Sequence, residues 1–314
     1  MSLTDSFVSG NYSSESGGGI FAGGVVSLTG STVSSNSSTR YGGGIRSAGA
    51  VLTNSHVVGN ITGFEADGTP ESFSDGGGIS TFFDGSVLLT NSTVIGNTSG
   101  DDSGGIDAEG DVSLTNSTVS GNVALGDGGG IYGEADATLV NSTVSGNVSG
   151  GDGGGLRFRS GDVSLINSTL SGNSSGGDGG GASFYGASPL LVNSTVTENV
   201  ALGLGGGIQL GASVFATDSF TLQNSIVAGN TDDGTAPDVE VDLDLVNVLV
   251  VEHSLIGDTT GSGVTAATGA GNILNQLPLL GTLADNGGPT QTHNLLPGSP
   301  APVSYTHLTL PTKA

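Results

Sequence analysis

Apolar and polar residues alternate with a period of two in short runs along this chain. In one representative stretch, Ala137 and Leu139 alternate with Thr138 and Val140, which are expected to point outward. Farther along, Val144 lies between Thr143 and Ser145. A period of two is typical of half-buried β-strands, whereas a helical repeat would place apolar residues at intervals of three and four. The pattern therefore predicts strands and excludes a helical repeat protein.

These runs recur at a fixed interval. An Asn-Ser-Thr element begins at residues 91, 116, 141, 167 and 193, so successive units are 25 or 26 residues long. A run of glycines followed by an apolar residue recurs once in each unit, which places turns at constant positions. Repeats of this length stack as solenoids, in which each coil buries small residues against its neighbours.

We predict an all-β, right-handed parallel β-helix of about ten coils, with three short strands in each coil and three parallel sheets. The β-helix is expected to cover residues 1–258, with an insertion near 61–74 and a C-terminal cap at 259–302. Residue 1 falls in the middle of a repeat, so we expect that a preceding segment, including any signal peptide, is missing from this fragment.

Composition narrows the function. The chain has 314 residues, 59 Gly, no Cys and a formal net charge of −24. Nucleic acids and anionic membrane surfaces are excluded as partners, because binding them requires a basic surface. No membrane-length apolar run is present. We expect a monomer that does not insert into a membrane and has a polysaccharide or a host or matrix surface as its partner.

A column of asparagines is expected at one corner of the coils. Asn tolerates the left-handed backbone of a bend, and its amide can bond to the Asn of the next coil. The alternative is glycosylation, because Asn-Ser-Thr is also an acceptor sequence. We favour a structural ladder of seven residues: Asn54, Asn91, Asn116, Asn141, Asn167, Asn193 and Asn224. A second column that includes Asn122 and Asn147 is expected to close the next corner.

Two segments resemble known families. The segment at 122–132 is similar to the repeat of bacterial polymorphic outer-membrane proteins, and Pro278–Ala301 resembles the choice-of-anchor Q domain. The resemblance implies bacterial origin, export and surface attachment, and it implies no chemistry. The localisation expected from it is secreted or on the bacterial cell surface. After Ala301 the sequence departs from this pattern, and we interpret residues 303–314 as a translated sequencing adapter, with an ordinary tail as the alternative.

The strand after each glycine run carries the main candidate site. Outward side chains of neighbouring coils lie about 5 Å apart, so one patch should form on this face. Its charged members are Asp107, Glu109, Glu134, Arg157 and Arg159, and its ring-bearing members are Tyr132 and Tyr185. Paired carboxylates suit glycoside hydrolysis, and Ca²⁺ beside an Arg would suit elimination, as in pectate-lyase-like β-helices. The alternative is a solvated face with a Glu134–Arg159 pair.

A column of Asp precedes the glycine runs and consists of Asp75, Asp102, Asp127, Asp152 and Asp178. Hydrogen bonding within the turn is the ordinary explanation, and Ca²⁺ is the ion that such oxygen ligands would suit. No other cofactor is expected. Two functions follow from the sequence: a surface protein with a structural or adhesive display role, and, as the alternative, a polysaccharide-active lyase or hydrolase.

Overall fold

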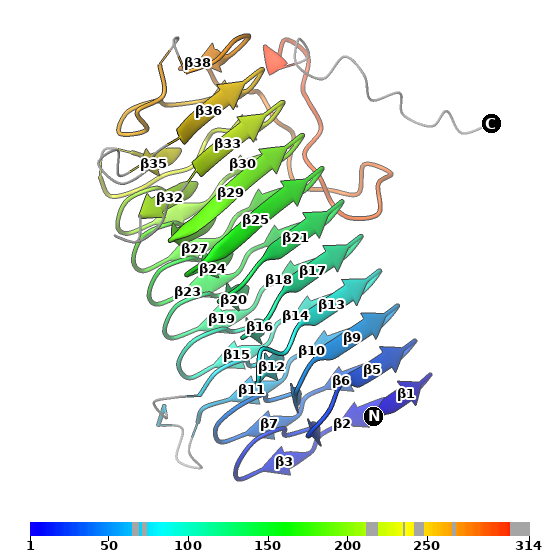
Figure 1. Cartoon of the computed structure of the whole chain (residues 1–314). Coiled ribbons are helices and arrows are strands. Elements are labelled where there is room, and N and C mark those ends of the chain that lie inside the picture. Colours follow the sequence, from blue (N-terminus) through cyan, green and yellow to red (C-terminus); the bar gives the residue numbers. More distant parts are fainter. Residues whose placement is uncertain are drawn as a thin grey trace, which may run out of the picture.

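The computed structural model describes residues 1–64, 69–70, 74–211, 219–234, 236–241, 248–265 and 268–301. These residues form a parallel β-solenoid in which short strands stack coil upon coil (Figure 1). The predicted parallel solenoid is confirmed. Among the described residues, no helix is long and apolar enough to cross a membrane. Within the expected insertion near 61–74, residues 65–68 and 71–73 lie outside the described residues.

Each complete coil contributes one strand to each of four parallel sheets, which we name A to D. Sheet A contains β1 (Ser2–Thr4), β5 (Val26–Thr29), β9 (Ala50–Thr53), β13 (Val87–Thr90), β17 (Val112–Thr115), β21 (Ala137–Val140), β25 (Gly161–Ile166), β29 (Ala187–Val192), β33 (Ser219–Gln223) and β36 (Val248–Glu252). Sheet B contains β2 (Phe7–Ser9), β6 (Thr32–Ser34), β10 (His56–Val58), β14 (Thr93–Ile95), β18 (Thr118–Ser120), β22 (Thr143–Ser145), β26 (Thr169–Ser171), β30 (Thr195–Thr197), β34 (Ile226–Val227), β37 (Leu255–Ile256) and β38 (Ile273–Leu274).

The other two sheets complete the coil. Sheet C contains β3 (Tyr12–Ser13), β7 (Ser37–Ser38), β11 (Ile61–Thr62), β15 (Thr98–Ser99), β19 (Val123–Ala124), β23 (Val148–Ser149), β27 (Ser174–Ser175) and β31 (Val200–Ala201). Sheet D contains β4 (Ile20–Ala22), β8 (Ile45–Ser47), β12 (Ile79–Thr81), β16 (Ile106–Ala108), β20 (Ile131–Gly133), β24 (Leu156–Phe158), β28 (Ala182–Tyr185), β32 (Ile208–Gly211) and β35 (Val239–Val241). The prediction of three strands per coil was wrong, because the two-residue strands of sheet C add a fourth side.

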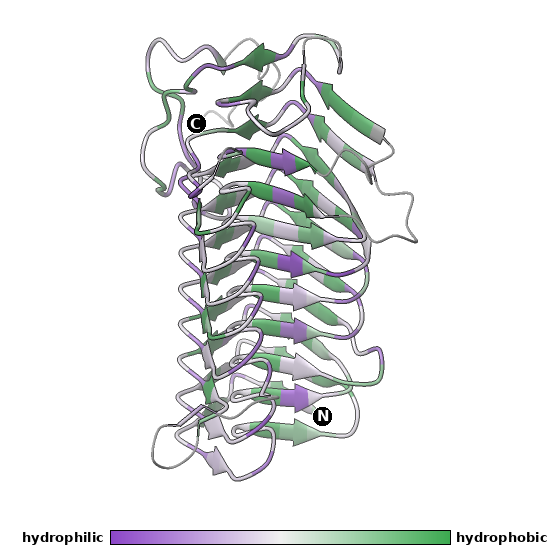
Figure 2. Ribbon diagram, turned by 90° about the vertical axis from the view of Figure 1, so that its left-hand side faces the viewer, coloured by the Kyte–Doolittle hydropathy of each residue, from purple (hydrophilic) through white to green (hydrophobic). Residues whose placement is uncertain are grey.

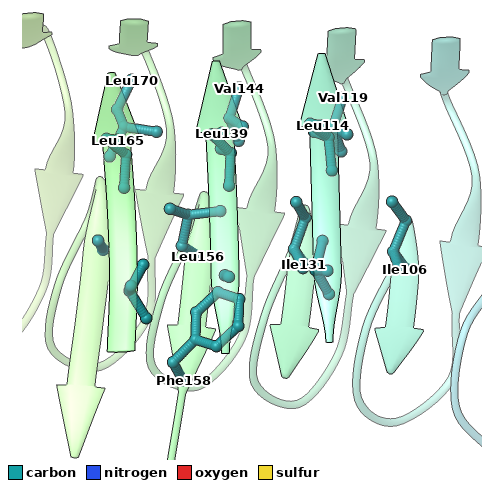
Figure 3. Packing of buried hydrophobic residues seen from close by; sticks show 14 of the residues in the cluster. Ile106, Leu114, Val119, Ile131, Leu139, Val144, Leu156, Phe158, Leu165 and Leu170 are labelled. Carbon is teal, nitrogen blue, oxygen red and sulfur yellow. The ribbon is translucent and has the colours of Figure 1, made fainter. Parts of the chain in front are cut away.

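The core is a stack of similar layers. In each layer the inward residues of sheets A, B and D meet, as Leu139, Val144 and Ile131 do, and all three are fully buried (Figure 3). Burying one such side chain contributes about 1.5–3 kcal/mol, and every coil repeats the contribution. Figure 2 shows the consequence within the strands, several of which carry hydrophobic residues next to more hydrophilic ones.

Two asparagine ladders hold the corners between the sheets. In the predicted column, Asn116, Asn141, Asn167 and Asn193 each donate from Nδ2 to Oδ1 of the preceding member at 3.1–3.2 Å. All seven members of this column, Asn54 and Asn224 included, have positive φ near 50°. These side chains are half-buried or exposed.

The second asparagine column is buried. Asn147 donates from Nδ2 to Oδ1 of Asn173 (2.9 Å) and to the carbonyl of Val119 (3.1 Å). Its Oδ1 accepts from the backbone and side-chain nitrogens of Asn122. The last member, Asn230, donates to Oδ1 of Asp238, a buried carboxyl group that closes this ladder.

The C-terminal segment folds back on the solenoid. Residues 278–301 run beside coils that lie well over one hundred positions earlier in the chain (Figure 1). Thr143 donates to the carbonyl of Gln291 (2.7 Å), and Ser171 is bonded to Nε2 of His293 (2.8 Å). Before this segment, sheet B continues past residue 258, because β38 pairs with β37. The interpreted adapter at 303–314 lies outside the described residues.

Candidate functional site

Sheet D presents one row of side chains along the solenoid axis. In β16, Ile106 and Ala108 are fully buried, and the intervening Asp107 is directed outward. Parallel pairing places the equivalent residue of each coil directly alongside, at the usual strand spacing of about 4.8 Å. From the N-terminal end the row contains Phe21, Arg46, Ser80, Asp107, Tyr132, Arg157, Ser183, Gln209 and Glu240.

A pocket of about 250 Å³ opens within this row. Ser80 and Asp107 have short side chains and lie between the longer Arg46 and Tyr132, so the face is hollowed over β12 and β16. Ser80 donates to Oδ2 of Asp107 (2.7 Å), and Arg46 donates to Ser80 and to the carbonyl of Thr81. The pocket is lined by Tyr41, Arg46, Asp75, Asp102, Asp107, Glu109, Tyr132 and Glu134.

Four residues of the predicted patch line the pocket, namely Asp107, Glu109, Tyr132 and Glu134, and three do not. Arg157 is 9% exposed and faces Asp127 (Nε–Oδ2, 3.6 Å) and Asp152 (Nη2–Oδ2, 3.4 Å). It also donates to the hydroxyl of Ser183 at 2.6 Å. The guanidinium of Arg157 therefore fastens neighbouring coils of the solenoid.

The other two predicted members lie beside the pocket. Arg159 is exposed and donates from Nη1 to the Tyr132 hydroxyl (3.1 Å), which steadies one wall of the pocket. Tyr185 is 44% exposed, and its ring lies 6.0 Å from the guanidinium carbon of Arg157. The geometry thus divides the predicted patch into a pocket and a separate Arg–Tyr surface.

The sequence pattern did not assign Tyr41 and Arg46 to the site, and it placed Asp75 and Asp102 only in the Asp column before the glycine runs. Arg46 follows a glycine run just as Asp107 does, so the register already placed it two coils from Asp107. The sequence gives no sign that Asp75 and Asp102 lie beside this row, because their position depends on the path of the turn in space. The turn before each strand of sheet D folds against the outward row, and this brings the Asp column beside it.

Burial and mutual repulsion raise the pKa values of these carboxyl groups. The pKa of Asp75 is raised to about 7, first by burial and then by the charges of Asp107, Asp102 and Asp101. Burial raises the pKa of Asp107 to about 6, against the opposing effects of the Ser80 hydrogen bond and Arg46. The pKa of Asp102 is also raised, mainly by burial. The pocket thus holds protonated and ionised carboxyl groups together near neutral pH.

The expected calcium ligands are bonded within the protein. Oδ1 of Asp127 accepts from the backbone nitrogen of Asp152 (2.8 Å), and Oδ1 of Asp152 accepts from that of Asp178 (2.9 Å). Asp178 accepts in the same way from Leu204 (2.7 Å). Within the described parts of the chain, no group of three or more His, Asp or Glu is arranged to hold a metal ion.

A comparison with protein families gives the chain its classification. The family described as "Right handed beta helix region" matches residues 106–276, which is more than half of the chain. The chain belongs to this family. In this right-handed β-helix, Asp107 and Tyr132 lie inside the matched residues, whereas Arg46 and Asp75 precede them. Comparisons with curated proteins and with solved structures found no match.

Proposed function

We propose that this β-helix protein is displayed outside the bacterial cell and adheres to a glycan through the outer face of sheet D. The observation that carries the proposal is the pocket over β12 and β16, where carboxyl groups, a guanidinium and two tyrosines meet.

The pocket has the size and chemistry for one sugar ring. Its volume is slightly below the range of about 300–1,000 Å³ that is usual for drug-sized ligands. Sugar hydroxyls both donate and accept hydrogen bonds, and the pocket offers acceptors on Asp107 and Glu134 and donors on Arg46 and Tyr132. Tyr132 is only 7% exposed, and the guanidinium of Arg46 covers one face of the Tyr41 ring at 4.5 Å, so the pocket itself offers a sugar polar contacts and little ring surface.

Display at the surface is supported by two further features. The net charge of −24 favours solubility and disfavours non-specific adhesion to nucleic acids. The stacked coils form an elongated body (Figure 1), and the pocket opens on its side, on the outer face of sheet D. A polysaccharide fits such an open face better than a small metabolite does.

The proposal is tested by a glycan array probed with the wild-type protein and two variants. Asp107→Asn with Glu134→Gln alters the pocket while keeping side-chain size, and Thr138→Ala alters the exposed face of sheet A. We expect binding that the double variant loses and the control keeps. An array without any bound glycan, or binding that the pocket variant retains in full, overturns the proposal.

Hydrolysis of the bound glycan is the second candidate, and the raised carboxyl pKa values favour it. Glycoside hydrolysis needs one protonated and one ionised carboxyl group. Asp75 would donate its proton to the leaving oxygen as the glycosidic C–O bond breaks. Glu109 or Glu134 would take a proton from the water that bonds to the anomeric carbon. Reducing ends released by the wild type, fewer above about pH 7 and none from Asp75→Asn, would support hydrolysis.

A further inference from the structure

Three phenylalanines form an exposed cluster at the N-terminal end of the outward row on sheet D. Phe21 is 63% and Phe83 83% exposed. The ring of Phe82 is stacked with Phe21 at 6.3 Å between centroids and meets Phe83 edge-on at 5.0 Å. Phe83 and the following Asp84 both have positive φ, at 58° and 56°. Consecutive left-handed residues are costly, and they cluster at binding sites, so this turn merits a functional explanation.

The cluster is continuous with the acidic pocket. The guanidinium carbon of Arg46 lies 4.5 Å from the ring centre of Tyr41 and 5.0 Å from that of Phe82. Arg46 is therefore shared, because it lines the pocket on one side and touches the rings on the other. From Phe21 to Tyr132 the row spans four strand spacings, about 19 Å, which is enough for several linked sugar rings.

The charges of the pocket restrict what can occupy it. Among the described residues that line it, five carboxyl groups face one guanidinium. The guanidinium of Arg46 is already bonded to Ser80 and Thr81, lies 3.9 Å from Oδ2 of Asp107 and is enclosed by rings. An anionic sugar would add negative charge to the pocket, and a neutral sugar would leave the repulsion among its carboxyl groups unrelieved. A ligand with an ammonium group would compensate the negative charge.

We propose that the strip from Phe21 to Tyr132 binds a polymer of amino sugars, with one free ammonium group in the carboxylate pocket and a neighbouring ring against Phe82 and Phe83. This inference rests on the proposed glycan binding and names its substrate class. The aromatic faces are suited to the apolar side of a sugar ring and, at their edges, to a nearby cation.

Binding of a cation also predicts release of protons. An ammonium group near Asp75 and Asp107 favours their ionised forms, so both carboxyl groups lose protons on binding. The heat of binding should therefore depend on the ionisation enthalpy of the buffer at about pH 6, where both groups are partly protonated. A neutral ligand that occupies the same strip should show a much weaker buffer dependence.

The experiment is calorimetric titration at about pH 6 and about 0.15 M salt, which limits non-specific attraction to the acidic protein. The probes are three tetrasaccharides: β-1,4-linked glucosamine, the same chain fully N-acetylated, and galacturonate. We expect the cationic chain to bind at least about ten-fold more tightly than the other two. Preferred binding of the acetylated or anionic chain overturns this inference and leaves glycan binding standing. If none of the three binds and the glycan array is also empty, both proposals fail.

Matched variants separate the pocket from general charge attraction. Asp107→Asn with Glu134→Gln should weaken binding of the cationic chain about ten-fold. The control is Asp136→Asn with Asp162→Asn, which removes two exposed carboxyl groups near the starts of strands β21 and β25 in sheet A. An equal loss in both pairs would mean non-specific polycation binding and overturn the inference.

A second pair of variants tests whether the aromatic cluster contributes to binding. Phe83→Asn, which suits a left-handed backbone, should weaken binding about ten-fold. Phe7→Ser removes an 81% exposed ring on sheet B and should change nothing. Retention of full affinity by Phe83→Asn would overturn the assignment of the aromatic cluster.

Discussion

At the scale of single residues, Asn147 and Asn141 belong to two columns with the same period, but they differ in burial and in the number of hydrogen bonds that they make. Asn147 is fully buried, and its side chain takes part in bonds with Asn122, Asn173 and Val119. Asn141 is only half-buried and bonds to its two ladder neighbours. The sequence predicted both columns, but their identical spacing could not reveal which one faces the interior.

The two columns should therefore respond differently to substitution. Asn147→Ala should lower the free energy of unfolding by about 3 kcal/mol or more, because each buried group left without a partner costs about 1–3 kcal/mol. Asn141→Gly, which keeps the left-handed backbone, should cost less than about 1 kcal/mol, since water replaces the lost bonds. Urea denaturation checks both values, and similar losses would contradict the assignment of the buried ladder.

Asp75 gives a prediction about pH. Its pKa is raised to about 7 in the folded protein, from about 3.9 in an unfolded chain. Between these values the unfolded state releases the proton that the folded state keeps, so stability falls as pH rises from about 4 to 7. Asp75→Asn should raise the urea midpoint at about pH 8 and leave it nearly unchanged at about pH 4. The exposed Asp84→Asn is the control, and an equal gain there would point to net charge alone.

At the scale of elements, two different physical constraints require glycine at different positions of one coil. A Cβ on Gly154 would lie 2.4–2.5 Å from backbone atoms of Gly180 and Ser174 in the next coil. A Cβ on Gly146 would meet no atom within 4 Å, and only its positive φ of 62° opposes a side chain.

We expect Gly154→Ala to cost about 3 kcal/mol or more, because adjacent backbones must separate. Gly146→Ala should cost about 1–2 kcal/mol from backbone strain alone. The free energies of unfolding of the two variants, measured side by side in urea, give the comparison. A larger loss of unfolding free energy for Gly146→Ala would mean that backbone strain, and not the close approach of the coils, explains the regular spacing of glycines within the repeat.

The elements also show where prediction from pattern reached its limit. Sheets A, B and D were predicted because most of their strands have three or more residues, which is enough for an inward and outward alternation to be visible. Strands such as β23 have two residues, one in and one out, and two residues carry no period. Sheet C was therefore taken for part of the corners, and one side of each coil was missed.

At the scale of the whole molecule, the candidate site comes from four successive coils, and the sequence supplied only part of it. The equal length of the repeats placed Asp107, Tyr132 and Glu134 on neighbouring strands of one face. The contacts that each of these side chains makes within the protein could not be predicted from the repeat length. Arg157 was expected to hold a ligand, but Asp127 and Asp152 lie close enough to neutralise it. Contacts between a corner and a strand depend on the path of the turn, which the repeat pattern does not encode.

The return of residues 278–301 along sheet B is the longest-range feature of the molecule, and it depends on few polar contacts. His293 bonds to Ser171 through Nε2 (2.8 Å) and to the carbonyl of Gly281 through Nδ1 (2.7 Å). Because these bonds are few and partly exposed, we expect the segment to detach locally while the solenoid stays folded.

His293→Ala should therefore raise the rate of cleavage by proteinase K within residues 281–296 by about ten-fold, the effect of losing one or two hydrogen bonds. The urea midpoint of the solenoid should not change. His56→Ala is the matched control, since His56 also lies on sheet B and bonds to Thr93 at 2.8 Å, far from this segment. Equal cleavage of both variants and the wild type would show that packing of the segment's apolar residues near Ala301, and not the His293 contacts, fastens it to the solenoid.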